Sequence, residues 1–99
     1  MNLGKVIGTV WSTRKDESLV GAKFLIVRQL KLDYSPTKSF IVAVDSVGAG
    51  VGEIVLVAQG SSARQTTITK NKPVDAVIMA IVDKLDISVK DNLEEMVEE

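Results

Sequence analysis

The fold of this chain is decided by residues 44–60, which read VDSVGAGVGEIVLVAQG. A glycine-rich loop here interrupts one apolar run and begins another. Glycines at 48, 50 and 52 permit positive φ and close approach of the backbone. The run Ile54–Val57 is β-branched or aliphatic and favours a buried strand. We therefore expect a tight corner between two strands, around which the other strands close.

The composition indicates a single small domain with an aliphatic core. Hydrophobic residues make up 45% of the 99 residues but aromatic residues only 4%, so Val, Ile, Leu and Ala must supply the core. A domain of this length has a modest core, and oligomerisation is one further source of stability for it. The length and composition therefore predict one domain that spans residues 1–99.

Charge and residue usage argue against several functional classes. Twelve basic and 13 acidic residues give a net charge of -1, which provides no general attraction for nucleic acid. Cysteine and histidine are both absent, which removes disulfides, zinc-thiolate sites, cysteine nucleophiles and the commonest general base. No apolar stretch approaches the length of a membrane-spanning helix. We expect a soluble intracellular protein with no cofactor and no metal, and with no nucleic acid or membrane as partner.

The remaining strands are predicted from apolar runs separated by turn residues. Gly4 and Gly8 lie inside the first run and indicate a bend or bulge. Pro36 fixes φ in a polar stretch at 33–39, which is expected to join two strands of a hairpin. The expected strands are 3–11, 23–32, 40–45, 54–58 and 74–82.

The C-terminal part allows more than one interpretation. Periodicity alone permits either a buried helix or a buried strand over 74–82, and its valine and isoleucine content favours the strand. Residues 84–89 alternate between polar and apolar, which predicts an edge strand that extends or returns the preceding one. The acidic stretch 91–99 carries apolar residues at helical spacing and is expected to form a short C-terminal helix or a frayed tail. The pattern as a whole predicts an all-β, five-stranded closed barrel.

The glycine loop has two chemical interpretations besides a structural one. Phosphate binding is disfavoured, because Gly48, Gly50 and Gly52 lead into a strand instead of a helix and lack the Gly-Lys-Ser/Thr ending of a Walker loop. Asp45 and Glu53 flank the loop and would be the carboxylates of an acid-base pair. We favour bracing of the turn by Asp45, and backbone or basic partners for Glu53.

A second small-residue corner follows at 60–64. Ser61 or Ser62 can cap a short turn of helix, and Gly60 and Ala63 permit close packing. Arg64 is suited either to an anion or to a bidentate pair across a subunit interface, of which we favour the interface.

Several separated motifs agree, in order, with one known family. They are GKVIGTV at 4–10, TRK at 13–15, LVGAK at 19–23, DSVGAG at 45–50, GE at 52–53, VLV at 55–57, GSSAR at 60–64 and PVDA at 73–76. Over nearly its whole length the chain resembles the EutN/CcmL family of bacterial microcompartment vertex proteins. Their joint occurrence is more specific than any single glycine pattern.

The resemblance implies a barrel related to the OB-fold, assembling as a homopentamer that caps the vertices of a polyhedral shell in the bacterial cytoplasm. Its partners would be further copies of itself and hexameric shell proteins, and its function would be structural and not enzymatic. Cyclic symmetry makes each interface head-to-tail. Carboxysomes and catabolic compartments share the motif, so the compartment type stays open. The candidates for the subunit interface or the central loop are Asp45, Gly48, Gly50, Gly52, Glu53, Gly60, Ser61, Ser62, Ala63 and Arg64.

Two alternative functions are weighed against this one. An OB-like module for single-stranded nucleic acid would use aromatic stacking and a basic groove, whereas the chain has four aromatic residues and an acidic pI. Trp11, the only indole, is accordingly interpreted as a core or interface anchor. A small enzyme would depend on Asp45 and Glu53, and nothing else in the sequence supports these carboxylates as catalysts.

Overall fold

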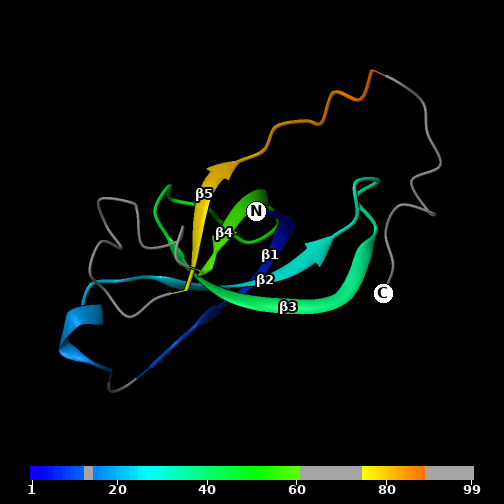
Figure 1. The fold of residues 1–99 in the computed structure, drawn as a ribbon. Coiled ribbons are helices and arrows are strands. Elements are labelled where there is room, and N and C mark those ends of the chain that lie inside the picture. The colour runs from blue at the N-terminus through cyan, green and yellow to red at the C-terminus, as the bar shows by residue number, and fades with distance from the viewer. Residues whose placement is uncertain (13–14, 61–74, 89–99) are drawn as a thin grey trace.

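The computed structural model describes residues 1–12, 15–60 and 75–88, which form a small β-barrel (Figure 1). The strands close in the order β1-β2-β3-β5-β4. Every neighbouring pair is antiparallel except β3 and β5, which pair in parallel. The predicted five-stranded closed barrel is thus confirmed. Its elements are β1 (Asn2–Val10), the 3₁₀ helix η1 (Glu17–Leu19), β2 (Phe24–Leu30), β3 (Pro36–Asp45), β4 (Ile54–Gln59) and β5 (Ala76–Ile81).

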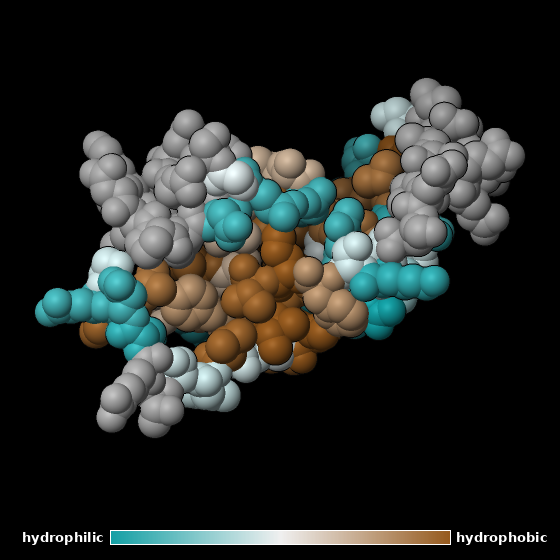
Figure 2. Space-filling view, turned by 60° about the horizontal axis from the view of Figure 1, so that its bottom comes forward, coloured by the Kyte–Doolittle hydropathy of each residue, from teal (hydrophilic) through white to brown (hydrophobic). Residues whose placement is uncertain are grey.

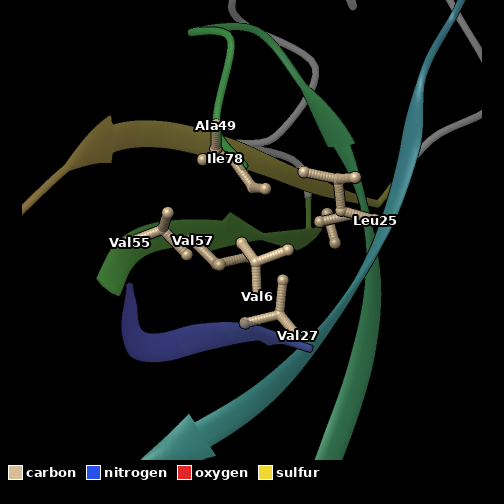
Figure 3. Close-up of a cluster of buried hydrophobic side chains, with 9 residues drawn as sticks. Val6, Leu25, Val27, Ala49, Val55, Val57 and Ile78 are labelled. Carbon is tan, nitrogen blue, oxygen red and sulfur yellow. The ribbon is translucent and has the colours of Figure 1, made fainter. Parts of the chain in front are cut away.

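Aliphatic side chains from all five strands fill the barrel, and the glycine loop adds one alanine (Figure 3). Alternate residues of a strand point to opposite faces, and the two core residues in each of β2, β4 and β5 are accordingly separated by one residue. Burying one such valine or isoleucine stabilises the fold by roughly 1.5–3 kcal/mol. The core consists of Val6, Leu25, Val27, Ala43, Ala49, Val55, Val57, Ala76 and Ile78.

A second apolar cluster lies on the outside of the barrel. Val44, Ala58 and Val77 each follow or precede a core residue along their strand, so they face the other way. The segment around η1 covers them, with Leu19, Ala22 and Phe24 packed against the cluster. The polar stretch after β1 is therefore held to the barrel by its apolar end.

Curvature of β1 occurs where the glycines predicted it. The register of β1 against β2 shifts between Val6 and Gly8, as at a bulge. At Gly4 the neighbouring strand comes so close that an added Cβ would overlap Cγ1 of Val27.

The hairpin between β2 and β3 has a shorter turn than the sequence suggested. β3 begins at Pro36 and not at residue 40, because the turn closes within 31–35. Lys31 N donates to Ser35 O at 2.8 Å, and Tyr34 takes a positive φ of 70°. The proline at the first position of the strand has no N–H to leave unpaired.

The expected edge strand at 84–89 is wrong for its described part, 84–88. These residues leave β5 as an extended arm without strand pairing (Figure 1). β5 already lies between β3 and β4, so its flanks offer the arm no free partner. Two hydrogen bonds hold the segment after β5: Val82 N donates to Ile54 O at 2.8 Å, and Leu85 N donates to the side-chain hydroxyl of Tyr34 at 2.9 Å. The helix or tail expected at 91–99 lies outside the described residues.

Candidate assembly site

The side chain of Asp45 stabilises the first half of the glycine loop. Its Oδ1 accepts hydrogen bonds from the backbone amides of Val47 at 3.0 Å, Gly48 at 3.1 Å and Ala49 at 3.2 Å. Three converging amides are the donors that a phosphate-binding loop would offer to an anion. Here the chain's own carboxylate occupies them, which confirms the bracing role and disfavours a nucleotide site.

Glu53 braces the other end of the same loop. Its Oε1 accepts from Gly50 N at 2.6 Å, while the main chain of Glu53 and Gly52 bonds to Val6 at 3.0 and 2.8 Å. The loop is thereby tied to β1 as well as to itself, and Ala49 is inserted into the barrel core with 1% exposure. The glycine loop therefore covers one end of the barrel core.

Positive φ is required at the two outer glycines of the loop only. Gly48 has φ of 75° and Gly52 has φ of 96°, a region that residues with a Cβ rarely adopt. Gly50 is not among the residues with positive φ, so it does not use the conformation that its lack of a side chain permits. Gly50 instead supplies the amide that Glu53 binds.

The loop has little capacity for catalysis. Asp45 Oδ1 and Glu53 Oε1 both accept from backbone amides, and neither faces a titratable partner in the hydrogen bonds described above. Within 1–12, 15–60 and 75–88, no group of three acidic side chains is arranged to hold a metal ion.

The second predicted corner is described only at its first residue. Gly60 has a positive φ of 66°, and its amide donates to Asp75 O at 2.8 Å. Ser61, Ser62, Ala63 and Arg64 lie outside the described residues. The structure therefore does not test their predicted place at a subunit interface.

Apolar side chains gather on the outer face over β2 and β3 (Figure 2). Phe40 is 56% exposed and Val42 is 51% exposed, although both belong to the central part of β3. Arg28 covers part of this face, with its guanidinium carbon 5.2 Å from the centroid of the Phe40 ring. An exposed apolar sheet face of this kind is typical of a surface that meets another protein.

Trp11 stands free of the barrel, directly after β1. Its exposure of 89% shows that it is not a core anchor, which leaves the interface as its predicted place. The indole borders a groove of about 620 Å³ between the end of β1 and the segment leading into β2. The sequence offered no signal for this groove, because its lining comes from separate stretches of the chain, 9–12, Lys15 and 22–24.

Comparisons with known proteins agree with this geometry. Residues 1–83 match the family model of the ethanolamine utilisation protein EutN/carboxysome. The microcompartment shell vertex protein GrpN of Rhodospirillum rubrum is 54% identical, over 87% of this chain and 97% of GrpN. The structure of that pentameric shell protein has a TM-score of 0.81. The structure of CcmL from Gloeobacter violaceus has a TM-score of 0.84 at 42% identity, covering 89% of this chain and 91% of CcmL.

The fold, the internally braced loop and these likenesses define a structural shell protein of the vertex class and not an enzyme. The chain belongs to the EutN/CcmL family. The family resemblance recognised from the sequence motifs is thus confirmed over residues 1–83. Among the described residues no helix has the length and apolar character needed to cross a membrane.

Proposed function

We propose that this chain forms a homopentamer that caps the vertices of a polyhedral microcompartment shell in the bacterial cytoplasm, beside hexameric shell proteins. The observation that carries the proposal is the match of residues 1–83 to a family whose relative GrpN is pentameric and 52% identical in its solved structure. Closing a shell of mostly hexagonal tiles requires fivefold units at its corners, which gives such a pentamer its task.

The surface of the barrel supports assembly with other chains. Phe40 and Val42 expose apolar area that a solitary soluble domain would usually cover. The glycine loop is stiffened by the Asp45 and Glu53 hydrogen bonds, so it can present Val47 and Val51 without rearrangement. Val51 is 65% exposed and Val47 38% exposed. We propose this loop as part of a subunit contact or of the central region of the ring.

Arg64 and the small residues Gly60, Ser61, Ser62 and Ala63 are proposed to lie at the same seam. If Arg64 pairs with a carboxylate of the next subunit and is largely desolvated, Arg64→Ala should cost roughly 2–5 kcal/mol at each interface. The ring should then dissociate while the barrel stays folded. Arg64→Lys keeps the charge but not the bidentate geometry, and should weaken the ring less.

Native mass spectrometry of the purified full chain tests the proposed function. A mass of five chains is expected for the wild type, and single chains with a native β-sheet circular dichroism signal for Arg64→Ala. A wild type that stays monomeric over the concentration range of assembly would contradict the pentamer. An intact pentamer in Arg64→Ala would place that side chain away from the seam.

A further inference from the structure

The chain carries an acidic extension that the family match does not include. The matched region ends at residue 83, and residues 89–99 hold five acidic side chains against one lysine. Leu93, Met96 and Val97 occur among these acids at helical spacing. A segment with this pattern combines an apolar stripe with strong negative charge. Its complement is a groove that is apolar inside and positive at the rim.

The groove beside Trp11 has this character. Phe24 and the exposed indole of Trp11 supply the apolar surface, and Lys15 and Lys23 supply the positive charge. The Lys15 ammonium lies 5.7 Å from the centroid of the Phe24 ring, so charge and apolar surface are adjacent. None of the residues lining the groove is acidic. The 89% exposure of Trp11 leaves the face of its indole available to an apolar side chain of a partner.

The ammonium groups of Lys15 and Lys23 each have hydrogen-bond donors left for a partner. The neighbouring carboxylate, Asp16, already accepts hydrogen bonds from Ser18. Lys15 Nζ donates to Ala22 O at 3.3 Å and Lys23 Nζ to Ala49 O at 3.4 Å, which uses one of three donors on each. Asp16, next to Lys15 in the sequence, accepts from Ser18 N at 2.9 Å and from Ser18 Oγ at 2.6 Å. Within the part of the chain that the structure describes, Lys15 and Lys23 thus retain donors for an acidic segment.

The arm and the groove lie at opposite ends of the molecule. Figure 1 shows the extended arm at one end of the long dimension, with η1 and the segment after β1 at the other. The molecule is 47 Å long, whereas eleven extended residues span at most about 36–40 Å. The Tyr34 hydroxyl bond to Leu85 N holds the arm in this direction. The described arm, 84–88, thus leads away from the groove of its own chain.

We propose that residues 89–99 of one copy dock into the Trp11 groove of the next copy. The proposal rests on the proposed ring, because contact between the arm end of one copy and the groove end of the next needs an interface that joins two different surfaces of the chain, as in a head-to-tail ring. Leu93 and Met96 cover Trp11, and the surrounding acids pair with Lys15 and Lys23. The extension would form an additional contact between neighbours, beyond residues 1–83 that match the family model.

Trp11 is the only tryptophan of the chain, so its fluorescence reports on the groove alone. In the full-length ring we expect blue-shifted emission and weak quenching by acrylamide. Replacing Leu93 and Met96 by Asp should raise the quenching constant several-fold and shift the emission to the red. The volume-conserving pair Leu93→Met and Met96→Leu is the matched control and should stay protected. Equal quenching in the wild type and in the Asp variant would overturn the proposal.

A charge exchange tests the polar part of the contact. Lys15→Glu should expose the indole to acrylamide, and adding Glu94→Lys and Glu95→Lys to it should restore protection. Failure of this exchange to restore protection would contradict pairing between the acids and Lys15. A single-stranded oligonucleotide that protects Trp11 where the tail does not would likewise overturn the proposal and favour a nucleic-acid site.

Mixed rings separate docking on a neighbour from docking on the same chain. One parent carries Trp11→Phe with the natural tail, and the other keeps Trp11 but carries the two Asp substitutions in the tail. Protection of the remaining indole after the parents are refolded together requires a neighbour's tail. Continued exposure in mixed rings would overturn docking between copies. Native mass spectrometry of the same samples reports the ring independently, so loss of the pentamer and loss of this additional contact are distinguishable.

Discussion

The Glu53 carboxylate accepts a hydrogen bond from the backbone amide of Gly50 at 2.6 Å, which closes the end of the glycine loop nearest β4. Together with the three amide contacts of Asp45, this bond stabilises the loop conformation in which Ala49 packs into the barrel core. The loop's acidic residues thus serve its conformation, and the following predictions concern the residues that maintain it.

Asp45→Ala should destabilise the barrel because it leaves three loop amides without their acceptor. We expect the free energy of unfolding to fall by about 1–3 kcal/mol. Asp45→Asn retains an acceptor oxygen and should cost less. Urea unfolding monitored by circular dichroism measures both variants. Equal stability of Asp45→Ala and the wild type would show that the loop does not depend on this carboxylate.

Gly52→Ala should destabilise the protein more than Gly50→Ala. An added Cβ at Gly52 meets no neighbouring atom. An alanine there must nevertheless keep the backbone φ of 96°, which costs about 1–2 kcal/mol for a residue other than glycine. At Gly50 the φ is not positive, and a Cβ would lie 3.4 Å from Glu53 Oε1, close to ordinary contact. The melting temperatures of the two variants give the comparison. The reverse order would contradict the described loop conformation.

Gly4→Ala should be poorly tolerated and Gly8→Ala tolerated. An added Cβ at Gly4 overlaps Cγ1 of Val27 and lies 3.0 Å from the backbone oxygen of Arg28, so β1 and β2 must separate. Such overpacking costs about 1–3 kcal/mol. At Gly8 the nearest atom is Ile26 Cδ1 at 3.6 Å, an ordinary contact. Denaturant midpoints measure both variants, and similar losses would argue against close approach of the strands at Gly4.

The hairpin turn should show a lowered carboxyl pKa. Hydrogen bonds from the hydroxyl and then the amide of Ser35 stabilise the ionised form of Asp33 and lower its pKa below the ordinary value. The resulting stabilisation is present above the unfolded pKa and is lost as the pH falls through the folded pKa. NMR titration should show Ser35→Ala raising the Asp33 pKa. Asp16, whose pKa is lowered by Ser18, is the internal control and should not change.

The strands and the family could be predicted from local patterns, because each strand contains an apolar run and each family motif is contiguous. The arm could not. Its alternation at 84–88 satisfies the pattern of a strand, but pairing requires a free neighbouring edge, which depends on the whole topology. The environment of Trp11 depends equally on tertiary placement. A lone aromatic predicts burial on average, yet this one follows the last residue of β1 and projects from the barrel.

The side-chain roles in the glycine loop could be predicted from the sequence, but its backbone conformation could not. The roles of Asp45 and Glu53 follow from their position beside glycines, since short polar side chains bond to the backbone of their own turn. The sequence did not predict which glycines adopt positive φ, because every glycine can adopt that conformation and the sequence does not show which of them does. The contact between Tyr34 and Leu85 links residues 51 apart in sequence and has no local signature.

The position of β5 between β3 and β4 has a consequence for synthesis of the protein on the ribosome. The last strand supplies both seams that close the barrel, so Val57 and Ala43 lack their cover until Ile78 has been translated and released. A nascent chain that ends before residue 81 therefore exposes an incomplete sheet with open edges, which is prone to non-native pairing. A closed barrel consequently forms only after β5 has been synthesised.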